Sequence, residues 1–144
     1  MRKKHAYTFE VLARFIHEYL KEEGLSLNFK GFKDTQKAYA RLNDNHISEV
    51  YDVLNDCHMW SNYLQEVSHF ISLKIEDIQL EVDNLSAQHD KKNPRFDLLD
   101  ELDKAKEKLK HFKLFAKELK SQRQFFVKAS ESCYRLYKKH AHQQ

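Results

Sequence analysis

Residues 47–85 read ISEVYDVLNDCHMWSNYLQEVSHFISLKIEDIQLEVDNL, and residues 98–137 read LLDELDKAKEKLKHFKLFAKELKSQRQFFVKASESCYRLY. Each stretch repeats apolar or small residues, with Arg123 as the exception, at alternating steps of three and four, which keeps one stripe facing a partner helix. In the first stretch these positions are Ile47, Val50, Leu54, Cys57, Ser61, Leu64, Ser68, Ile71, Ile75, Ile78, Val82 and Leu85. In the second they are Leu98, Leu102, Ala105, Leu109, Phe112, Ala116, Leu119, Arg123, Phe126, Ser130, Cys133 and Tyr137. We therefore expect two long helices that pair along this seam.

A polar break separates the two stretches and contains Pro94, the only proline of the chain. With two glycines besides, the sequence has few turn residues, which favours an all-α protein folded as an antiparallel helical hairpin. We predict a single helical domain over residues 1–144. It consists of N-terminal helices and a connector (1–46), a long helix (47–88), a loop (89–95) and a second long helix (96–140).

The N-terminal part predicts shorter helices. Thr8 is placed to cap a helix over residues 9–23, which Gly24 ends. Residues 25–33 are expected to form an apolar connector, and Asp34 to cap a short helix that runs to about Leu42.

A second apolar stripe divides the hairpin into two zones. On the first long helix it consists of Val53, Trp60, Tyr63, Val67 and Phe70, and on the second it widens the seam only after about residue 115. We expect the N-terminal helices to cover this base as a three- or four-helix bundle, and residues 72–112 to project as a bare two-helix finger. Pairing positions whose numbers sum to 183 or 184 places Ser61 opposite Arg123. The same register brings Lys106 near Asp77 and Glu76, which would neutralise its charge.

Composition limits the class of protein. No run of about 18 apolar residues is present, which argues against a membrane span. The basic start, Met1-Arg-Lys-Lys-His5, is followed by charged residues rather than an apolar segment, which argues against a secretory signal. The two cysteines, Cys57 and Cys133, lie on the seam about a heptad apart in height, too far for a disulfide, so a reducing cytoplasm fits best.

Motifs for chemistry are sparse. Glu66 and His69 have the Glu-x-x-His spacing of di-iron bundles, but the second motif that such a site needs is missing. The histidines are scattered apart from His140 and His142, and no Cys-x-x-Cys or His-Glu-x-x-His motif occurs. We expect no metal, no cofactor, no small-molecule substrate and no enzymatic activity.

One short motif keeps an enzyme among the alternatives. Arg135-Leu-Tyr-Lys-Lys-His140 has the Arg-x4-His spacing and resembles the motif of the small helical HEPN ribonucleases. That resemblance implies an RNA phosphate held between Arg135 and His140. In this family the motif normally opens a helix, whereas here it ends one.

Charge is distributed unequally. Residues 47–88 carry eight acids and one base, whereas residues 95–140 carry thirteen bases and seven acids. The simple interpretation of this charge difference is electrostatic attraction between the two long helices of the hairpin. A row of lysines on the second helix offers another, because its length of roughly 21 Å suits a phosphate backbone. The nearby Phe112, Phe115, Phe125 and Phe126 are candidates for base stacking, although the simpler interpretation makes Phe112 and Phe126 core positions. The candidate nucleic-acid-binding residues are Lys106, Lys110, Lys113, Lys117, Lys120 and Arg123.

Residues Phe96–Leu136 resemble the C-terminal helix of phage recombination-mediator proteins. The resemblance is carried by Asp97-Leu-Leu, Lys106-Glu-Lys-Leu109, Phe112 and Lys128-Ala-Ser-Glu131, and extends loosely to residues 47–85. It implies a small self-assembling protein that binds single-stranded DNA and assists a recombinase. The first 46 residues show no such similarity.

Three functions follow from these patterns. The first is a non-catalytic helical adaptor or assembly protein, which contacts a partner protein or another copy of itself along the exposed hairpin. The alternative is a single-stranded nucleic-acid-binding accessory that uses the lysine row, and the second alternative is the HEPN-like ribonuclease.

Overall fold

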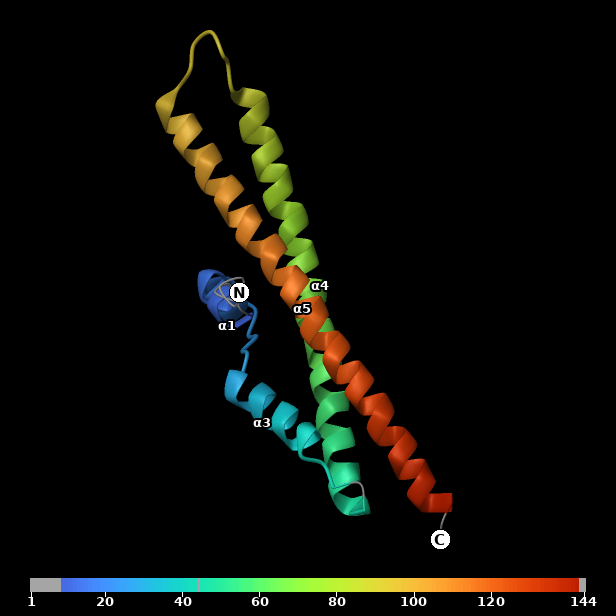
Figure 1. Ribbon diagram of the computed structural model, residues 1–144. Helices are drawn as coiled ribbons and strands as arrows, with labels where there is room; N and C mark the ends of the chain where they lie inside the picture. Colours follow the sequence, from blue (N-terminus) through green and yellow to red (C-terminus); the bar gives the residue numbers. More distant parts are fainter. Residues whose placement is uncertain (1–8, 44, 143–144) are drawn as a thin grey trace, which may run out of the picture. The chain divides into compact units, whose positions relative to one another are not determined.

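The computed structural model describes residues 9–43 and 45–142, and every regular element in these ranges is an α-helix (Figure 1). The helices are α1 (Phe9–Phe15), α2 (His17–Glu22), α3 (Phe29–Ala40), α4 (Ile47–Gln88) and α5 (Phe96–His142). The all-α fold with two long paired helices is confirmed. None of the described helices combines the length and apolar character needed to cross a membrane.

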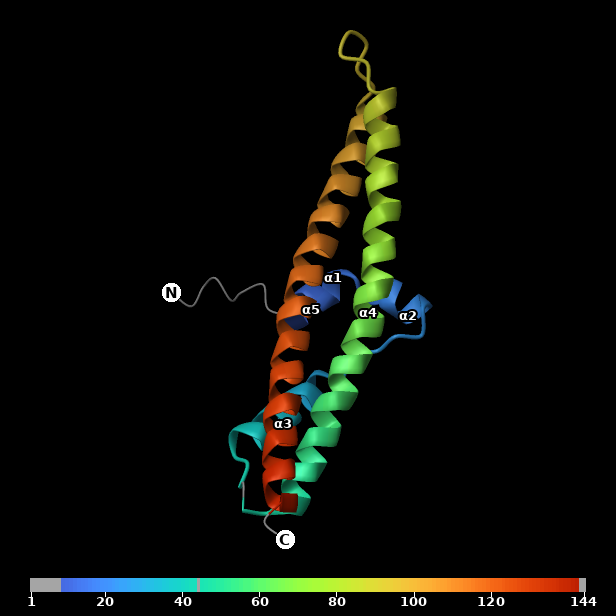
Figure 2. The ribbon, with the colours of Figure 1, turned by 90° about the vertical axis from the view of Figure 1, so that its right-hand side faces the viewer.

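Contacts group the chain into two compact units. Unit 1 contains residues 9–23 and Ser68–Glu118, and unit 2 contains Gly24–Val67, apart from residue 44, with residues 119–142. In each unit a stretch of α4 lies antiparallel to a stretch of α5 (Figure 2). The prediction of one domain over residues 1–144 stays a prediction.

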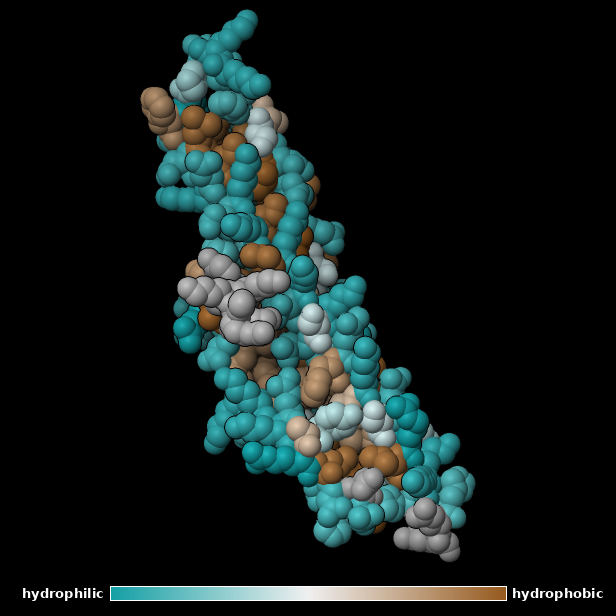
Figure 3. All heavy atoms as spheres, in the orientation of Figure 1, coloured by the Kyte–Doolittle hydropathy of each residue, from teal (hydrophilic) through white to brown (hydrophobic). Residues whose placement is uncertain are grey.

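The seam read from the sequence forms the core of both units. In unit 1, Ile71, Ile78 and Val82 of α4 are buried together with α5 residues Leu98, Leu102, Ala105, Leu109 and Phe112. In unit 2 the buried seam residues are Val50, Cys57, Ser61, Leu64, Leu119, Phe126 and Cys133. Figure 3 shows apolar residues along the hairpin of unit 1, with hydrophilic side chains on both sides. Burial of these stripes is the main force that holds the paired helices together.

In unit 2, α3 packs on the predicted base of the hairpin. The ring of Phe32 lies 4.3 Å from that of Trp60 and 6.1 Å from that of Phe126, measured between ring centroids. The indole nitrogen of Trp60 donates a hydrogen bond to Thr35 Oγ1 at 3.1 Å. Covering of this part of the hairpin by an N-terminal helix is thereby confirmed.

The start of α3 was predicted wrongly. The helix begins at Phe29 because the Asn28 side chain caps it and accepts a hydrogen bond from the Gly31 amide at 2.9 Å. The expected connector over residues 25–33 is therefore half helical, and Asp34 lies inside the helix. The earlier start also brings Phe32 onto the α3 face that contacts Trp60.

The predicted helix over residues 9–23 is divided in two. Ile16 leaves helical geometry, with φ −116° and ψ 11°, and its amide donates to the carbonyl of Ala13 in a tight turn. Gly24 ends α2 as predicted, with the positive φ of 70° that glycine adopts without strain. The predicted cap, Thr8, lies outside the described residues.

The bare finger over residues 72–112 is also a wrong prediction, because α1 and α2 cover part of it in unit 1. Phe15 of α1 stacks on His111 with ring centroids 4.1 Å apart, and Tyr19 of α2 meets Phe112 edge-on at 5.3 Å. Lys74 Nζ and Lys108 Nζ lie 5.8 and 5.6 Å from the Tyr19 ring centroid. Apolar periodicity did not predict this contact because two of the residues around the tyrosine, besides Phe112, are lysines.

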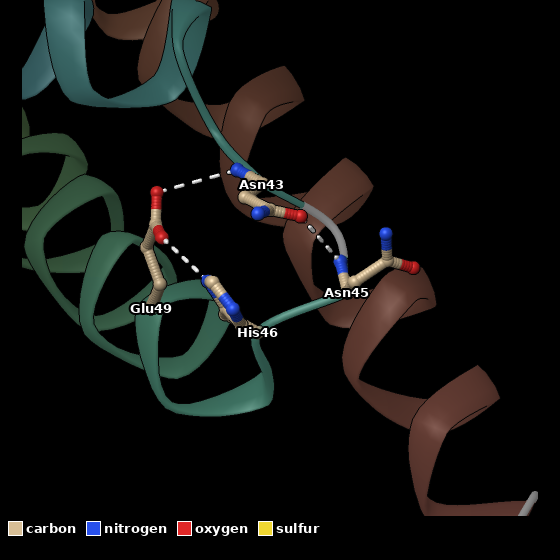
Figure 4. Close-up of polar contacts among 4 residues, drawn as sticks. All are labelled: Asn43, Asn45, His46 and Glu49. Atoms are coloured by element: carbon tan, nitrogen blue, oxygen red, sulfur yellow. Dashed lines mark hydrogen bonds and ion pairs between the residues drawn. The ribbon is translucent and has the colours of Figure 1, made fainter.

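A small polar cluster joins α3 to the first turn of α4 in unit 2 (Figure 4). Glu49 Oε1 accepts a hydrogen bond from the Asn43 amide at 3.2 Å, and Glu49 Oε2 lies 3.6 Å from His46 Nδ1. The carboxylate also lies in the first turn of α4, where the helix dipole favours negative charge.

Candidate nucleic-acid interface

Four of the predicted lysines form a basic ridge in unit 1, defined here as Lys106, Lys110, Lys113 and Lys117. All four side chains are exposed. Within residues 9–43 and 45–142, no carboxylate forms an ion pair with any of them. Helix rise gives the ridge a length of about 16 Å. None of the four lysines is therefore held in an ion pair inside the described part of the molecule.

The ion pair between the two arms forms on the other flank of the seam. Lys108 Nζ lies 3.5 Å from Glu81 Oε2, and these residues directly precede the seam residues Leu109 and Val82. Lys106 and Lys113 instead follow seam residues, and in an antiparallel pair such positions face each other across the seam. The matching α4 residues are Ser72, Gln79 and Ser86, which carry no charge. The register had predicted that Lys106 lies near Asp77. This arrangement explains why the two residues form no ion pair.

Two acids of α5 have partners away from the basic ridge. Asp100 Oδ2 lies 3.1 Å from Lys104 Nζ, and Glu107 Oε1 lies 3.5 Å from His111 Nε2. Both pairs form within a single helix and their carboxylates are exposed, so they contribute little to stability. They leave the basic ridge as the surface of unit 1 where unpaired positive charge is concentrated.

The flank of the seam that Tyr19 covers is less suited to binding an anionic ligand than the basic ridge. Two open grooves, of about 430 and 220 Å³, share Tyr19, Glu81 and Lys108 in their linings. The remaining lining residues include both acids and lysines, among them Glu101 and Lys104. Mixed and partly paired charges of this kind do not select an anionic ligand.

The remaining two predicted residues lie in unit 2 and differ from each other. Lys120 is exposed, without an ion-pair partner among the described residues. Arg123 is half-buried and turns toward α4, where its Nε donates to the Ser61 carbonyl oxygen at 3.3 Å. A second nitrogen of Arg123 donates to Gln65 Oε1 at 3.2 Å. Arg123 therefore takes part in helix pairing, as the Ser61–Arg123 register predicted.

The phenylalanines proposed for base stacking are not accessible. Phe112, Phe115 and Phe126 are fully buried, and Phe125 packs against Phe126 and Tyr39. Phe112, Phe115 and Phe126 belong to the cores of their units, as the simpler interpretation of Phe112 and Phe126 predicted, and Phe125 is half-buried.

Tyrosines that the sequence analysis did not select are exposed instead. In unit 2, Tyr51 and Tyr134 expose about half of their surface, and Tyr51 lies 5.7 Å from Tyr137 between ring centroids. Lys138 Nζ lies 5.5 Å from the centre of the Tyr134 ring. The sequence could have predicted this exposure, because Tyr51 and Tyr134 each directly follow a seam residue and therefore lie at the edge of the seam.

Groups with metal or nucleophile chemistry are dispersed. Glu66 and His69 are both exposed, and the described ranges contain no cluster of three or more His, Cys, Asp or Glu side chains suited to a metal. Arg135 donates a hydrogen bond to Ser132 Oγ at 3.4 Å. The ribonuclease interpretation of Arg135 and His140 stays a prediction.

Both thiols are free and buried in unit 2. Burial, followed by the proximity of Cys133 and of Asp56, raises the pKa of Cys57 to about 12. Burial also raises the pKa of Cys133. A thiol that resists ionisation is a poor nucleophile, so these cysteines behave as small core residues.

Comparison of the chain with protein-family models, with curated proteins and with solved structures gave no match. The resemblance to recombination mediators accordingly remains a prediction.

Proposed function

We propose that this protein is a non-catalytic helical accessory protein that binds single-stranded nucleic acid along the basic ridge of α5. The observation that carries the proposal is the exposure of Lys106, Lys110, Lys113 and Lys117 without an ion-pair partner in the described residues. Binding of a phosphate backbone releases counterions from the nucleic acid, which is the main driving force of sequence-independent binding.

The expected mode is backbone contact without sequence readout. Lysine presents a flexible point charge rather than a planar fork, so the basic ridge is suited to phosphates but not to particular base edges. A protein of this kind is expected to act in the reducing cytoplasm, where Cys57 and Cys133 stay as thiols.

Fluorescence anisotropy with labelled single-stranded DNA and RNA tests the proposal. We expect salt-sensitive binding that weakens at least tenfold in the Lys110→Glu/Lys113→Glu/Lys117→Glu variant, because three attractive contacts become repulsive. The matched control is Lys21→Glu/Lys30→Glu/Lys37→Glu, which changes the net charge equally at exposed positions of α2 and α3.

Two results would contradict the proposal. One is the absence of binding at low salt. The other is an equal loss of affinity in both triple variants, which would show that net charge rather than the basic ridge determines binding.

The helical adaptor, acting through protein–protein contacts or self-association, is the second candidate function. It is favoured by two leucines that α4 exposes in unit 1, Leu73 and Leu80. These leucines and the basic ridge lie on different helices, so the two functions do not compete for the same residues.

A further inference from the structure

An apolar pair lies on the outer face of α4 in unit 1. Leu73 exposes 49% and Leu80 61% of its surface, and the two are one heptad apart. The buried seam residues Ile71, Ile78 and Val82 lie on the opposite side of the same helix. The contacts of Tyr19 with Lys74 and Lys108 occupy a flank of the seam and leave this outer face open.

Acidic side chains border the two leucines on both sides. Helical spacing places Glu76 and Asp83 along one side and Asp77 along the other. All three are exposed, and no basic group in the described ranges forms an ion pair with them. Lys74, the one base of α4, lies over the rings of Tyr19 and Phe70 instead. The face is therefore apolar along its middle and acidic at its edges, and Asp77 also lines an open groove together with Tyr19 and Lys74.

This charge pattern indicates which kind of partner fits the outer face of α4. Two copies of the face would place acids against acids, which disfavours a symmetric contact between copies of α4. The basic ridge of a second copy supplies positive charge, but the half-buried Leu114 is the apolar residue beside it, and Glu107 and Ser121 stand one heptad away. The ridge therefore offers no apolar pair at heptad spacing to the two leucines. The complementary surface has apolar residues at heptad spacing and bases beside them.

We infer that the outer face of α4, centred on Leu73 and Leu80, docks a basic amphipathic helix of a partner protein. The partner's apolar residues pack on the two leucines, and its lysines or arginines pair with Glu76, Asp77 and Asp83. This inference names the partner chemistry for the adaptor function, on which it rests, and is independent of nucleic-acid binding.

The test uses the full chain and a synthetic helical peptide that carries leucines at heptad spacing with lysines on both sides. Isothermal titration calorimetry should show binding that falls about tenfold or more in the Leu73→Gln/Leu80→Gln variant, because central apolar anchors supply most of the binding energy. Both positions are exposed, so circular dichroism should show an unchanged fold. The control variant is Met59→Gln, which removes an exposed apolar residue of unit 2. The control peptide has the same composition in scrambled order.

Four results would overturn the inference: no binding of the amphipathic peptide to the wild-type chain, equal binding to the Leu73→Gln/Leu80→Gln variant, equal binding of the scrambled peptide, or self-association that this variant abolishes. The last would identify a second copy as the occupant. Nucleic-acid binding is measured separately and fails in the lysine variant, so failure of one proposal is distinguishable from failure of the other.

Discussion

Arg123 of α5 donates a hydrogen bond from its Nε to the Ser61 carbonyl oxygen of α4 at 3.3 Å, so a charged residue occupies a seam position of unit 2. Ser61 is small enough to leave room for the guanidinium beside the α4 backbone, and Gln65 accepts from the same arginine. The pair joins the two long helices where an apolar layer would otherwise be expected.

The first prediction concerns this pair. Arg123→Lys loses the two-nitrogen contact, and we expect the free energy of unfolding to fall by about 1–3 kcal/mol, the value of hydrogen bonds from a charged group. Urea denaturation followed by circular dichroism measures the change. Lys120→Ala is the control and should be nearly neutral. If Arg123→Lys instead lost oligonucleotide affinity at unchanged stability, Arg123 would contact the nucleic acid rather than stabilise the helix pair.

Gly31 is predicted to resist even the smallest side chain. A Cβ at this position would lie 2.9 Å from the Trp60 ring, which the hydrogen bond to Thr35 holds in place. We expect Gly31→Ala to lower the free energy of unfolding by about 1–3 kcal/mol through overpacking. The shifted transition should be visible in the fluorescence of Trp60, the only tryptophan of the chain.

Gly24 provides the comparison for Gly31. No atom lies within 4 Å of a Cβ built there, but φ is 70°. Gly24→Ala should therefore cost about 1 kcal/mol through backbone strain alone, and Gly24→Asn should cost less. If Gly31→Ala were as stable as the wild type, the close approach of α3 to Trp60 would be wrong.

The third prediction follows from the raised pKa of Cys57. The thiol ionises near pH 9 when unfolded and near 12 when folded, so the folded state disfavours the thiolate. Its contribution to stability is complete below pH 9 and is lost as the pH rises toward 12. Thermal unfolding between pH 8 and 10.5 should show this decline, and the Cys57→Ala variant should show a smaller one.

The same burial predicts slow thiol chemistry. A disulfide reagent should modify Cys57 and Cys133 at the rate of unfolding rather than at the rate of a free thiol. Rapid labelling of the folded chain would contradict the core positions of both residues.

The fourth prediction is the salt dependence of the basic ridge. If Lys110, Lys113 and Lys117 each neutralise one phosphate, replacing all three by alanine should reduce the slope of log affinity against log salt by about 2. Anisotropy titrations at several salt concentrations measure the slope. An unchanged slope would mean that the three lysines do not contact the phosphate backbone.

The sequence by itself determined the two long helices, their break and their seam. A regular repeat of apolar residues is a local property of the chain, and residues such as Ile71 and Phe112 can bury themselves only if the helices pair along that stripe. The Ser61–Arg123 layer followed from the same register.

The tertiary structure alone decided which flank of that seam is covered and which charges stay unpaired. Helical spacing gave the lysine row, but its exposure depends on the uncharged Ser72, Gln79 and Ser86 across the seam and on the pairing of Lys108 with Glu81. The position of Tyr19 between Lys74 and Lys108 joins residues far apart in the chain. Hydrophobic periodicity could not predict it, because lysine side chains flank the aromatic ring where it meets Phe112.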